Sequence, residues 1–263
     1  MGILNVTPDS FSDGGSFADP DTALARAEAM VAEGVDIIDV GGESTRPGSQ
    51  RISAETEALR VVAVIEAIVD RFDIPVSIDT TKSIVARRAI DAGAEIINDI
   101  SALRFDPEIA RIAAETRAGL VLMHSRGTFE TLHSEPHVDD VMSDVVAGLQ
   151  RAIFEAISHG VKPENIVVDI GIGFGKSKHQ NLELIAKLDR LAVEFADFPI
   201  LVGTSRKSFI GKILGGLPPE ERLNGSLATA ATAVWNGAKV VRVHDVGPTV
   251  QALKMTASLV RVR

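Results

Sequence analysis

The sequence contains no cysteine. A chain without cysteine has no disulfide framework, no zinc–thiolate site and no thiol nucleophile. The sequence also lacks an apolar run that approaches the ~20 residues of a membrane span, and no signal-peptide pattern opens it. We therefore expect a soluble, cytoplasmic protein that has no membrane partner.

Positive charge is scarce in this chain. Its 263 residues include 27 Lys and Arg against 36 Asp and Glu, which gives a formal net charge of -9, and the sequence pI is about 5.2. A nucleic-acid groove is not expected in so acidic a chain. An anionic substrate would require local clusters of cations, so the segments in which Arg and Lys gather are informative.

Short runs rich in Val and Ile alternate with longer segments of helical period. Segment 21–30 is Ala-rich and amphipathic, Gly34 ends it, and 35–40 follows as a strand. Helical segments recur at 54–70, 83–92, 107–117, 138–159 and 180–195, and apolar runs lie at 1–5, 37–39, 76–79, 95–98, 120–123, 166–169, 200–203 and 239–242. This alternation is typical of βα units around a buried parallel sheet.

Eight strands with eight helical connections, in a chain near the ~250 residues of a typical barrel, predict a single domain over 1–263 with the TIM (β/α)₈ barrel fold. An open flavodoxin-like or Rossmann sheet is the alternative. The glycine-rich run 171–175 does not support that alternative, because a dinucleotide fingerprint follows the first strand and spaces its glycines differently.

Nearly every predicted strand ends in, or is soon followed by, a polar residue or a Gly-rich turn. In a (β/α)₈ barrel all of these ends lie on one face, where the loops form one active site. Asp79, Asn98 and Asp169 would be costly to bury there unless hydrogen-bond donors lie opposite them. A ligand with several N–H donors, such as a pterin or purine edge, would satisfy them. Helix N-capping is the alternative, above all for Asp79.

The first two loops are polar. Segment 5–15 combines Asn, Asp, hydroxyl residues and a Gly pair, and its oxygens suit Mg²⁺ beside phosphate oxygens. A plain capped turn explains this composition equally well. In segment 41–48 the glycines allow close backbone approach, and Arg46 can grip an anion. Glu43 is either a functional carboxylate or a partner of local N–H groups.

Two later loops gather cations. Segment 204–208 holds two of them beside hydroxyl groups at a helix N-terminus, and segment 242–245 adds an arginine and a histidine. Such groups form an anion site through their charge and the helix dipole, often beside the last two loops of a barrel. Surface charges near helix caps are the alternative. A lone histidine at a strand end, such as His124, is more often a hydrogen-bonded structural residue, and the histidine spacings match no metal triad.

Eight motifs follow one another over essentially the whole chain, at segments 1–15, 41–48, 77–80, 97–99, 122–124, 173–176, 205–208 and 242–245. Together they resemble the dihydropteroate synthase family of pterin-binding enzymes. The resemblance implies a transferase of folate biosynthesis that joins 6-hydroxymethyl-7,8-dihydropterin pyrophosphate to p-aminobenzoate, giving 7,8-dihydropteroate and pyrophosphate. It also implies Mg²⁺ as cofactor, a homodimer formed through the last helices, and sulfonamides as competitors of p-aminobenzoate.

The resemblance implies site residues as well. The pterin would lie against Asp79, Asn98, Met123, Asp169, Phe174, Gly203, Lys207 and Arg242. The pyrophosphate would contact Asn5, Thr45, Arg46, Arg242 and His244, with Mg²⁺ held by Asn5 and Asp13. The p-aminobenzoate pocket would be formed by Phe11, Thr45, Pro47, Lys207 and Ser208. Catalysis would depend on Asp79, Asp169, Lys207, Arg242 and His244.

With these residues we expect a dissociative substitution. Departure of pyrophosphate leaves a pterin methylene cation, and Asp79 and Asp169 place negative charge near it. Mg²⁺ and the cationic loops stabilise the leaving group. The aniline nitrogen then attacks without a strong base. We also expect the pyrophosphate to help close the first two loops before p-aminobenzoate binds.

The chain departs from the family pattern in two places. Ile170 stands where Pro is common, which is expected to loosen the turn that carries Asp169 and Phe174. The chain also begins inside its first strand, so we expect the natural start upstream. Two other functions are alternatives. A pterin-binding methyltransferase domain would need neither Arg46 nor the cationic loops, and a non-catalytic paralogue should have lost groups such as Lys207. All of these groups are present.

Overall fold

The computed structural model describes residues 1–7, 20–46, 48–134 and 138–262. Within them, parallel strands lie side by side in chain order: β1 (Gly2–Asn5), β2 (Ile38–Gly41), β3 (Val76–Asp79), β4 (Ile96–Asp99), β5 (Gly119–Met123), β6 (Ile166–Asp169), β7 (Ile200–Val202) and β8 (Val240–Val241). Gly2 also bridges Val243 in parallel, and the N–H of Ile3 donates to the Val243 carbonyl at 2.9 Å. These contacts join the two ends of the sheet. The predicted TIM-barrel fold is confirmed, and the open-sheet alternative is wrong.

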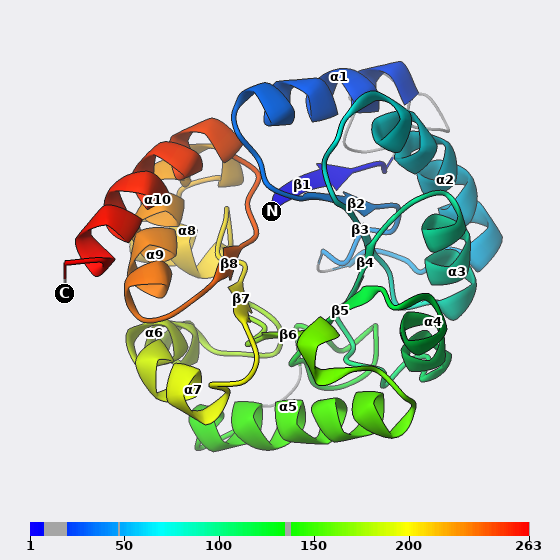
Figure 1. Ribbon diagram of the computed structural model, residues 1–263. Coiled ribbons are helices and arrows are strands. Elements are labelled where there is room, and N and C mark those ends of the chain that lie inside the picture. Colours follow the sequence, from blue (N-terminus) through cyan, green and yellow to red (C-terminus); the bar gives the residue numbers. More distant parts are fainter. Residues whose placement is uncertain (8–19, 47, 135–137, 263) are drawn as a thin grey trace.

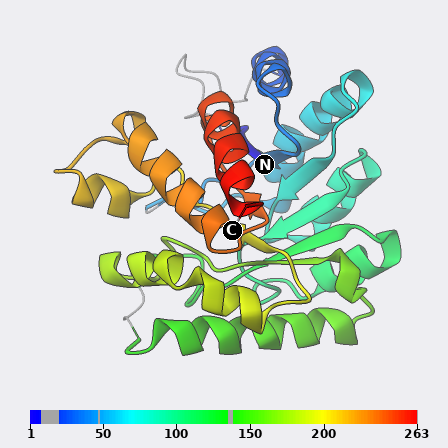
Figure 2. The same cartoon turned by 60° about the vertical axis from the view of Figure 1, so that its left-hand side comes forward.

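Helices connect the strands and form an outer ring around them (Figure 1). They are α1 (Pro20–Ala32), α2 (Ala54–Arg71), α3 (Ser83–Asp91), α4 (Glu108–Thr116), α5 (Val141–Ser158), α6 (Lys178–Ala186), α7 (Leu188–Glu194), α8 (Ser208–Ile213), α9 (Leu223–Trp235) and α10 (Val246–Val260). Short 3-10 turns lie at η2 (Pro163–Asn165) and η3 (Pro219–Glu221). Helices α9 and α10 run side by side at one edge of the ring (Figure 2). Across the described ranges, no helix is long and apolar enough to cross a membrane.

The segment predicted as one helix, 180–195, forms two. The backbone leaves the helical region at Lys187, whose φ is -105° and ψ is 21°, between α6 and α7. The side-chain amide of Asn236 donates to the carbonyls of Ile185 and Ala186, at 2.9 and 3.3 Å, and so satisfies groups that the end of α6 leaves free. The prediction of a single helix was wrong, because the contact that ends α6 comes from a residue far along the chain.

Helix α2 illustrates how the outer ring is attached. The Ser53 hydroxyl accepts from the N–H of Thr56 at 3.2 Å and caps the start of the helix. The side chains of Val61, Val64, Ile65 and Ile68 are buried at helical spacing and join the core formed by the outward faces of the strands. Burial of each such side chain contributes roughly 1.5–3 kcal/mol. Packing against the barrel therefore fixes the helix in place.

The side chains inside the barrel change in character along its axis. At the amino-terminal ends of the strands, apolar side chains form a floor made of Met1, Ile37, Ile96, Val121, Val167, Leu201 and Val240. Because side chains of a strand alternate between faces, the residues two positions further along point into the barrel again. Those positions include Asp39, Asn98, Asp169 and Arg242. The interior thus has an apolar floor and a charged mouth.

Candidate active site

Arg242 lies in the centre of a charged cluster inside the barrel. Its Nε donates to Oδ2 of Asp39 at 2.6 Å, and its Nη2 donates to Oδ2 of Asp79, also at 2.6 Å. Nδ2 of Asn98 donates to the same Asp39 oxygen at 3.1 Å. Asp39 is fully buried and Asn98 is 2% exposed. The barrel mouth therefore holds two carboxylates, one guanidinium and one amide in mutual contact.

Burial shifts the pKa of several groups at the mouth. It raises the pKa of Asp79 to about 7, although the nearby Arg242 opposes the shift. Burial likewise raises the pKa of Asp169 and lowers the pKa of Lys207 to about 8. The cause in each case is that a charged form loses the stabilisation of water. Strongly shifted groups gathered in one place are typical of a functional site.

An apolar wall stands beside the charged groups. Nζ of Lys207 lies 4.2 Å from the ring centroid of Phe174. Phe174 and Met123 are buried in one small cluster with residues of the loops after β4 and β5. Gly203 has no side chain, and a Cβ added to it would lie 3.8 Å from Cβ of Arg242. Acceptors on one side and flat apolar surface on another suit a planar, donor-rich heterocycle.

The turn after β6 has Ile170 at the position where the resemblance led us to expect proline. Oδ1 of Asp169 accepts from the N–H of Gly171 at 2.7 Å. A Cβ on Gly171, whose φ is +67°, would lie 1.8 Å from the His124 carbonyl oxygen, so the turn requires glycine there. Nζ of the buried Lys176 donates to the carbonyls of Gly171 and Phe174 at 2.8 and 3.2 Å. Lys176 thus ties this turn together from inside, and the loosening expected from Ile170 stays a prediction.

His124 supports this turn from the end of β5. It is 5% exposed, its Nδ1 lies 3.1 Å from Nζ of Lys176, and its Nε2 lies 3.3 Å from Oδ2 of Asp144. Burial lowers the pKa of His124 to about 4. Both ring nitrogens thus lie beside polar groups of the protein, as expected for a structural histidine.

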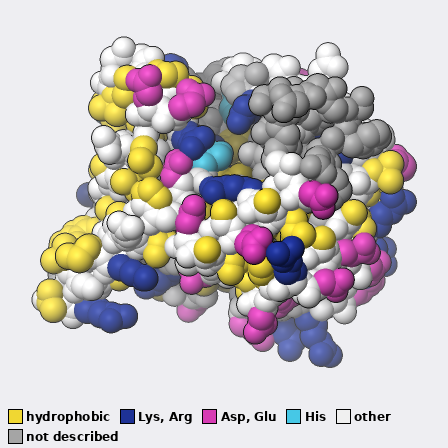
Figure 3. All heavy atoms as spheres, turned by 90° about the horizontal axis from the view of Figure 1, so that it is seen from above, with side chains coloured by type: hydrophobic (Ala, Val, Ile, Leu, Met, Phe, Trp, Pro, Cys, Tyr) yellow, Lys and Arg dark blue, Asp and Glu magenta, His cyan; other side chains and the backbone are white. Residues whose placement is uncertain are grey.

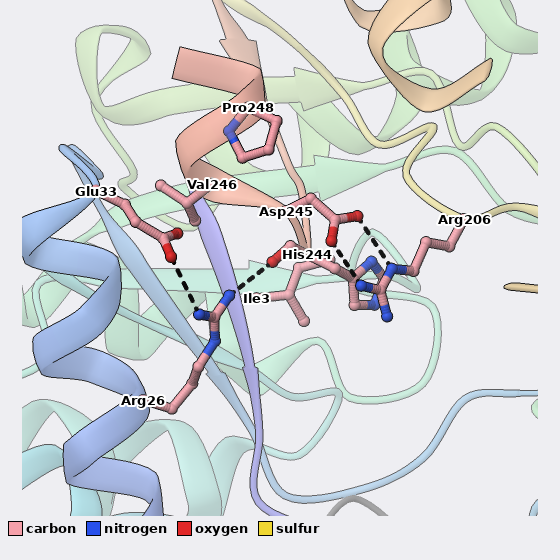
Figure 4. A pocket seen from close by; sticks show the side chains of 8 residues that line it. All are labelled: Ile3, Arg26, Glu33, Arg206, His244, Asp245, Val246 and Pro248. Carbon is pink, nitrogen blue, oxygen red and sulfur yellow. Dashed lines mark hydrogen bonds and ion pairs between the residues drawn. The ribbon is translucent and has the colours of Figure 1, made fainter. Parts of the chain in front are cut away.

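The loops after β7 and β8 meet around a cavity of about 420 Å³, whose lining includes Arg26, Glu33, Arg206, His244 and Asp245 (Figure 4). In the view from above, Lys or Arg side chains and a histidine surround a hollow (Figure 3). Arg206 pairs with Asp245 through two hydrogen bonds of 3.0 and 2.6 Å. Of the two cations predicted in segment 204–208, Arg206 is thus neutralised by Asp245, and Lys207 lies over Phe174.

His244 is fixed at the rim of this cavity. Its backbone N–H donates to Oγ of Ser205 at 3.1 Å, and its Nδ1 lies 3.1 Å from the same oxygen. Burial, and next the charge of Arg242, lower the pKa of His244 to about 3. The side chain is therefore neutral at pH 7 and can act as a hydrogen-bonding group beside a bound anion.

The loop after β2 approaches the mouth from the other side. A Cβ on Gly41 would lie 3.7 Å from Oδ1 of Asn5 and 3.8 Å from Oδ2 of Asp79, so these two groups flank one glycine. Oε1 of Glu43 accepts from the N–H of Ile52 at 2.7 Å and pairs with Nζ of Lys82 at 2.8 Å. Of the two interpretations of Glu43, the structure supports its role as a hydrogen-bond partner of local N–H groups.

The remaining predicted residues differ in how far they are described. The side chains of Arg46 and Ser208 are exposed, and Thr45 is half-buried. Phe11, Asp13 and Pro47 lie outside the described residues. In the part of the chain that the structure describes, no three His, Cys, Asp or Glu side chains converge to hold a metal ion.

Comparison with known proteins agrees with this geometry. A family model described as "Pterin binding enzyme" matches residues 1–244. The chain belongs to the pterin-binding enzymes. A dihydropteroate synthase of Synechocystis sp. is 46% identical over 261 residues, which cover 99% of this chain and 90% of that protein. The predicted resemblance to that family is confirmed.

Two solved structures of the family are also similar. The dihydropteroate synthase of Xanthomonas albilineans with 4-aminobenzoic acid has a TM-score of 0.91 and 43% identity, covering 98% of this chain and 91% of that one. The dihydropteroate synthase of Yersinia pestis in a sulfonamide drug complex has a TM-score of 0.92 and 42% identity, covering 100% and 94%. The fold of this pterin-binding enzyme is therefore shared by relatives with related ligands.

Sequence reasoning missed two residues of this pterin-binding enzyme. The sequence pattern places Asp39 at the end of an apolar run, and its alternation with Ile and Val in a buried strand is the signal of an inward-facing charge. His133 gave no such signal. Its Nε2 lies 2.7 Å from the Thr45 carbonyl oxygen and its Nδ1 lies 3.2 Å from that of Gly173. Its ring also stacks on Phe174 at 5.1 Å. His133 thus ties three loops together.

Proposed function

We propose that this chain is an active dihydropteroate synthase, which condenses 6-hydroxymethyl-7,8-dihydropterin pyrophosphate with p-aminobenzoate to give 7,8-dihydropteroate and pyrophosphate in folate biosynthesis. The observation that carries the proposal is the barrel mouth, where Asp79, Asn98 and Asp169 stand beside the Lys207–Phe174 pair. Relatives that match nearly the whole chain have the same name and support the assignment to the transferases.

The pterin would lie in the mouth with its N–H groups toward the acceptors Asp79, Asn98 and Asp169. Asn98 donates an N–H of its amide to Asp39, which leaves its amide oxygen to accept from a ligand. Met123, Phe174 and Gly203 would line the faces of the ring, with Lys207 and Arg242 beside it. Three acceptors in one place select a ligand edge made of donors, since an unmatched buried acceptor is costly.

The pyrophosphate would contact groups at the rim, namely Asn5, Thr45, Arg46, Arg242 and His244. As the carbon–oxygen bond to pyrophosphate breaks, the carboxylates of Asp79 and Asp169 stabilise the pterin cation, and the guanidinium groups of Arg46 and Arg242 stabilise the leaving group. The aniline nitrogen of p-aminobenzoate then forms the new bond and loses a proton. No strong base is needed, because an arylamine that attacks a cation becomes acidic as the bond forms.

The p-aminobenzoate pocket would be formed by Phe11, Thr45, Pro47, Lys207 and Ser208. The family structures with 4-aminobenzoic acid and with a sulfonamide drug support this part of the proposal. We expect sulfonamides to compete at the same pocket. Because pyrophosphate helps to close the first two loops, p-aminobenzoate should bind after the pterin substrate.

Mg²⁺ fits the described side of the proposed metal site. Asn5 offers a hard oxygen ligand at the end of β1, and Mg²⁺ in enzymes is usually held by one or two carboxylates together with substrate phosphate oxygens. Asp13 is the second proposed ligand. When bound, the ion would neutralise the charge of the leaving pyrophosphate.

The test is release of pyrophosphate from the pterin substrate with Mg²⁺, with and without p-aminobenzoate. Lys207→Ala is compared with the wild type, and Lys212→Ala, an exposed lysine of α8, the helix that follows Lys207, serves as the control. We expect amine-dependent release that collapses in Lys207→Ala and persists in the control. Pterin binding without amine-dependent release in the wild type would overturn the proposal and favour a non-catalytic paralogue.

Three coarser features belong to the same proposal: a single domain over 1–263, a cytoplasmic location and a homodimer. The exposed apolar side chains of Ile213, Trp235, Met255 and Leu259 on the last helices support a dimer formed there. Burial of such side chains in a partner interface is favourable. Sedimentation of the wild type and of Met255→Glu tests it, and a monomeric wild type would contradict it.

A further inference from the structure

Asp39 is a buried acid that the proposed mechanism does not use. It belongs to β2, it is fully buried, and only its Oδ2 is engaged by the described residues. Oδ1 has no hydrogen-bond partner among them. Burial of an ionised carboxylate costs several kcal/mol unless it is paired and hydrogen-bonded. An acid that a strand keeps at such a position has a role in the cluster around it.

The contacts of Asp39 fix it from two directions. Asn98 donates to Oδ2 from β4, and Arg242 donates to the same oxygen from the end of β8. With 0% of its surface exposed, Asp39 has no room to follow a moving partner. Arg242 is 20% exposed at its side chain and reaches Asp79 through Nη2. In the Asp39–Arg242 pair, the acid is therefore the fixed member and the guanidinium the movable one.

Arg242 has two tasks that compete. Its Nη2 donates to Oδ2 of Asp79, the carboxylate that the pterin is proposed to need. A ligand that donates N–H groups to both oxygens of Asp79 competes with Nη2 for Oδ2. The Nε contact to Asp39 does not involve Asp79, so it can persist while Nη2 turns away.

We propose that Asp39 is a positioning residue for the pterin substrate, which anchors Arg242 through Nε so that the rest of its guanidinium can release Asp79 and turn toward the substrate. This inference rests on the proposed function. Without the anchor, Arg242 keeps Asp79 as its carboxylate partner inside the barrel and competes with the pterin. Asp39 thus holds Nε of Arg242 in place while the rest of the guanidinium moves, and it need not touch the substrate itself.

The proposal is tested by steady-state kinetics of Asp39→Asn, which keeps the shape and removes the charge. We expect the KM for the pterin pyrophosphate to rise on the order of 10-fold to 100-fold, with the KM for p-aminobenzoate within about twofold of wild type. Ser77→Ala is the matched control. Ser77 is the register partner of Asp39 in β3, is equally buried, and has a hydroxyl without a partner in the described residues. The KM of Ser77→Ala for the pterin pyrophosphate should stay at the wild-type value.

A double variant shows whether Asp39 acts through Arg242. If it does, Asp39→Asn adds no more than about a twofold rise in KM when Arg242 is already Gln, because coupled residues are not additive. This pair removes both buried charges, so it also serves if Asp39→Asn alone does not fold. A wild-type KM in Asp39→Asn, or a further tenfold rise in the double variant over Arg242→Gln, would overturn the inference.

Failure of the inference differs from failure of the proposed function. Absence of amine-dependent turnover in the wild type rejects the function, and it does so before any Asp39 variant is made. If the wild type turns over and Asp39→Asn has the wild-type KM for the pterin pyrophosphate, only the positioning role of Asp39 is rejected.

Discussion

The two ends of the barrel interior are built from the same strands, and yet they have opposite chemistry. Leu201 in β7 belongs to the apolar floor, and its register partner in β6 is Asp169, which belongs to the mouth. Both side chains are buried. The difference is that the floor is sealed by its own neighbours, whereas the mouth leaves acceptors that a ligand has to satisfy. On one strand, a floor residue that contributes to stability and a mouth residue that can contact a ligand are only two positions apart.

The largest expected effect is at the mouth. Asp169→Asn should lower kcat/KM for the pterin pyrophosphate by about 10³-fold, because the amide would turn its NH₂ group toward the donors of the substrate while its oxygen accepts from Gly171. Asp99→Asn is the control. Asp99 accepts from Ser101 and Leu103 on the outer side of β4, so its variant should melt at a lower temperature and keep its kcat/KM. An equal loss of kcat/KM in Asp169→Asn and Asp99→Asn would contradict this prediction.

The floor should respond in stability instead. Leu201→Ala leaves a cavity and should lower the free energy of unfolding by about 3 kcal/mol, measured by denaturant titration. Its KM for both substrates should stay near the wild-type value. Leu182→Ala, at an exposed site of α6, should change the free energy of unfolding by much less. A large rise in KM for Leu201→Ala would mean that floor and mouth are not independent.

Acid should weaken ligand binding at the mouth. Burial raises the pKa of Asp79 from 3.8 to about 7, and a ligand that donates N–H groups binds its ionised form. Affinity for a pterin without phosphate groups should therefore fall as the pH drops below 7, by up to about tenfold per pH unit. Calorimetric titration between pH 5 and 8 measures it, and Asp79→Asn should flatten the profile. A profile of the same slope in that variant would assign the effect to another group.

The same shift affects stability in a defined direction. A carboxyl group whose pKa is raised in the folded state binds more protons folded than unfolded. The stability that Asp79 contributes is present below its unfolded pKa of 3.8 and is lost as the pH rises through about 7. Ligand binding and folding therefore place opposite demands on this residue.

The smallest expected effect lies in the loops above the mouth. His133→Ala removes contacts to the carbonyls of Thr45 and Gly173 and should raise the KM for p-aminobenzoate about threefold, as expected for the loss of one net hydrogen bond. His159→Ala, at an exposed position after α5, is the control. Equal KM values for the wild type and His133→Ala would show that the three loops hold their places without this residue.

Much of the fold could be predicted because the signals are local. The predicted strand 166–169 matches β6, and the predicted helix 54–70 matches α2 to within one residue. The break at Lys187 could not be predicted, since the apolar period continues through it and the capping group belongs to Asn236. Local patterns fix where elements form, but contacts across the fold decide where some of them end.

The predicted site follows the same division. Asp79, Asn98, Asp169 and Arg242 could be predicted to converge, because a barrel brings the ends of its strands to one face. Their pairing could not, since nothing in the order of residues says that Arg242 reaches two acids that lie 203 and 163 positions away. The role of Asp39 depends on that pairing, so it emerged from the structure.

The bridge between Gly2 and Val243 has a consequence for aggregation of the protein. Each strand of the described sheet has a neighbour on both sides, so no row of free N–H and C=O groups invites another chain to pair. Release of β1 would expose two such rows at once, one on β2 and one on β8. Loss of the first few residues from their place should therefore promote aggregation before it removes the core, and the amino-terminal strand protects the protein against self-association.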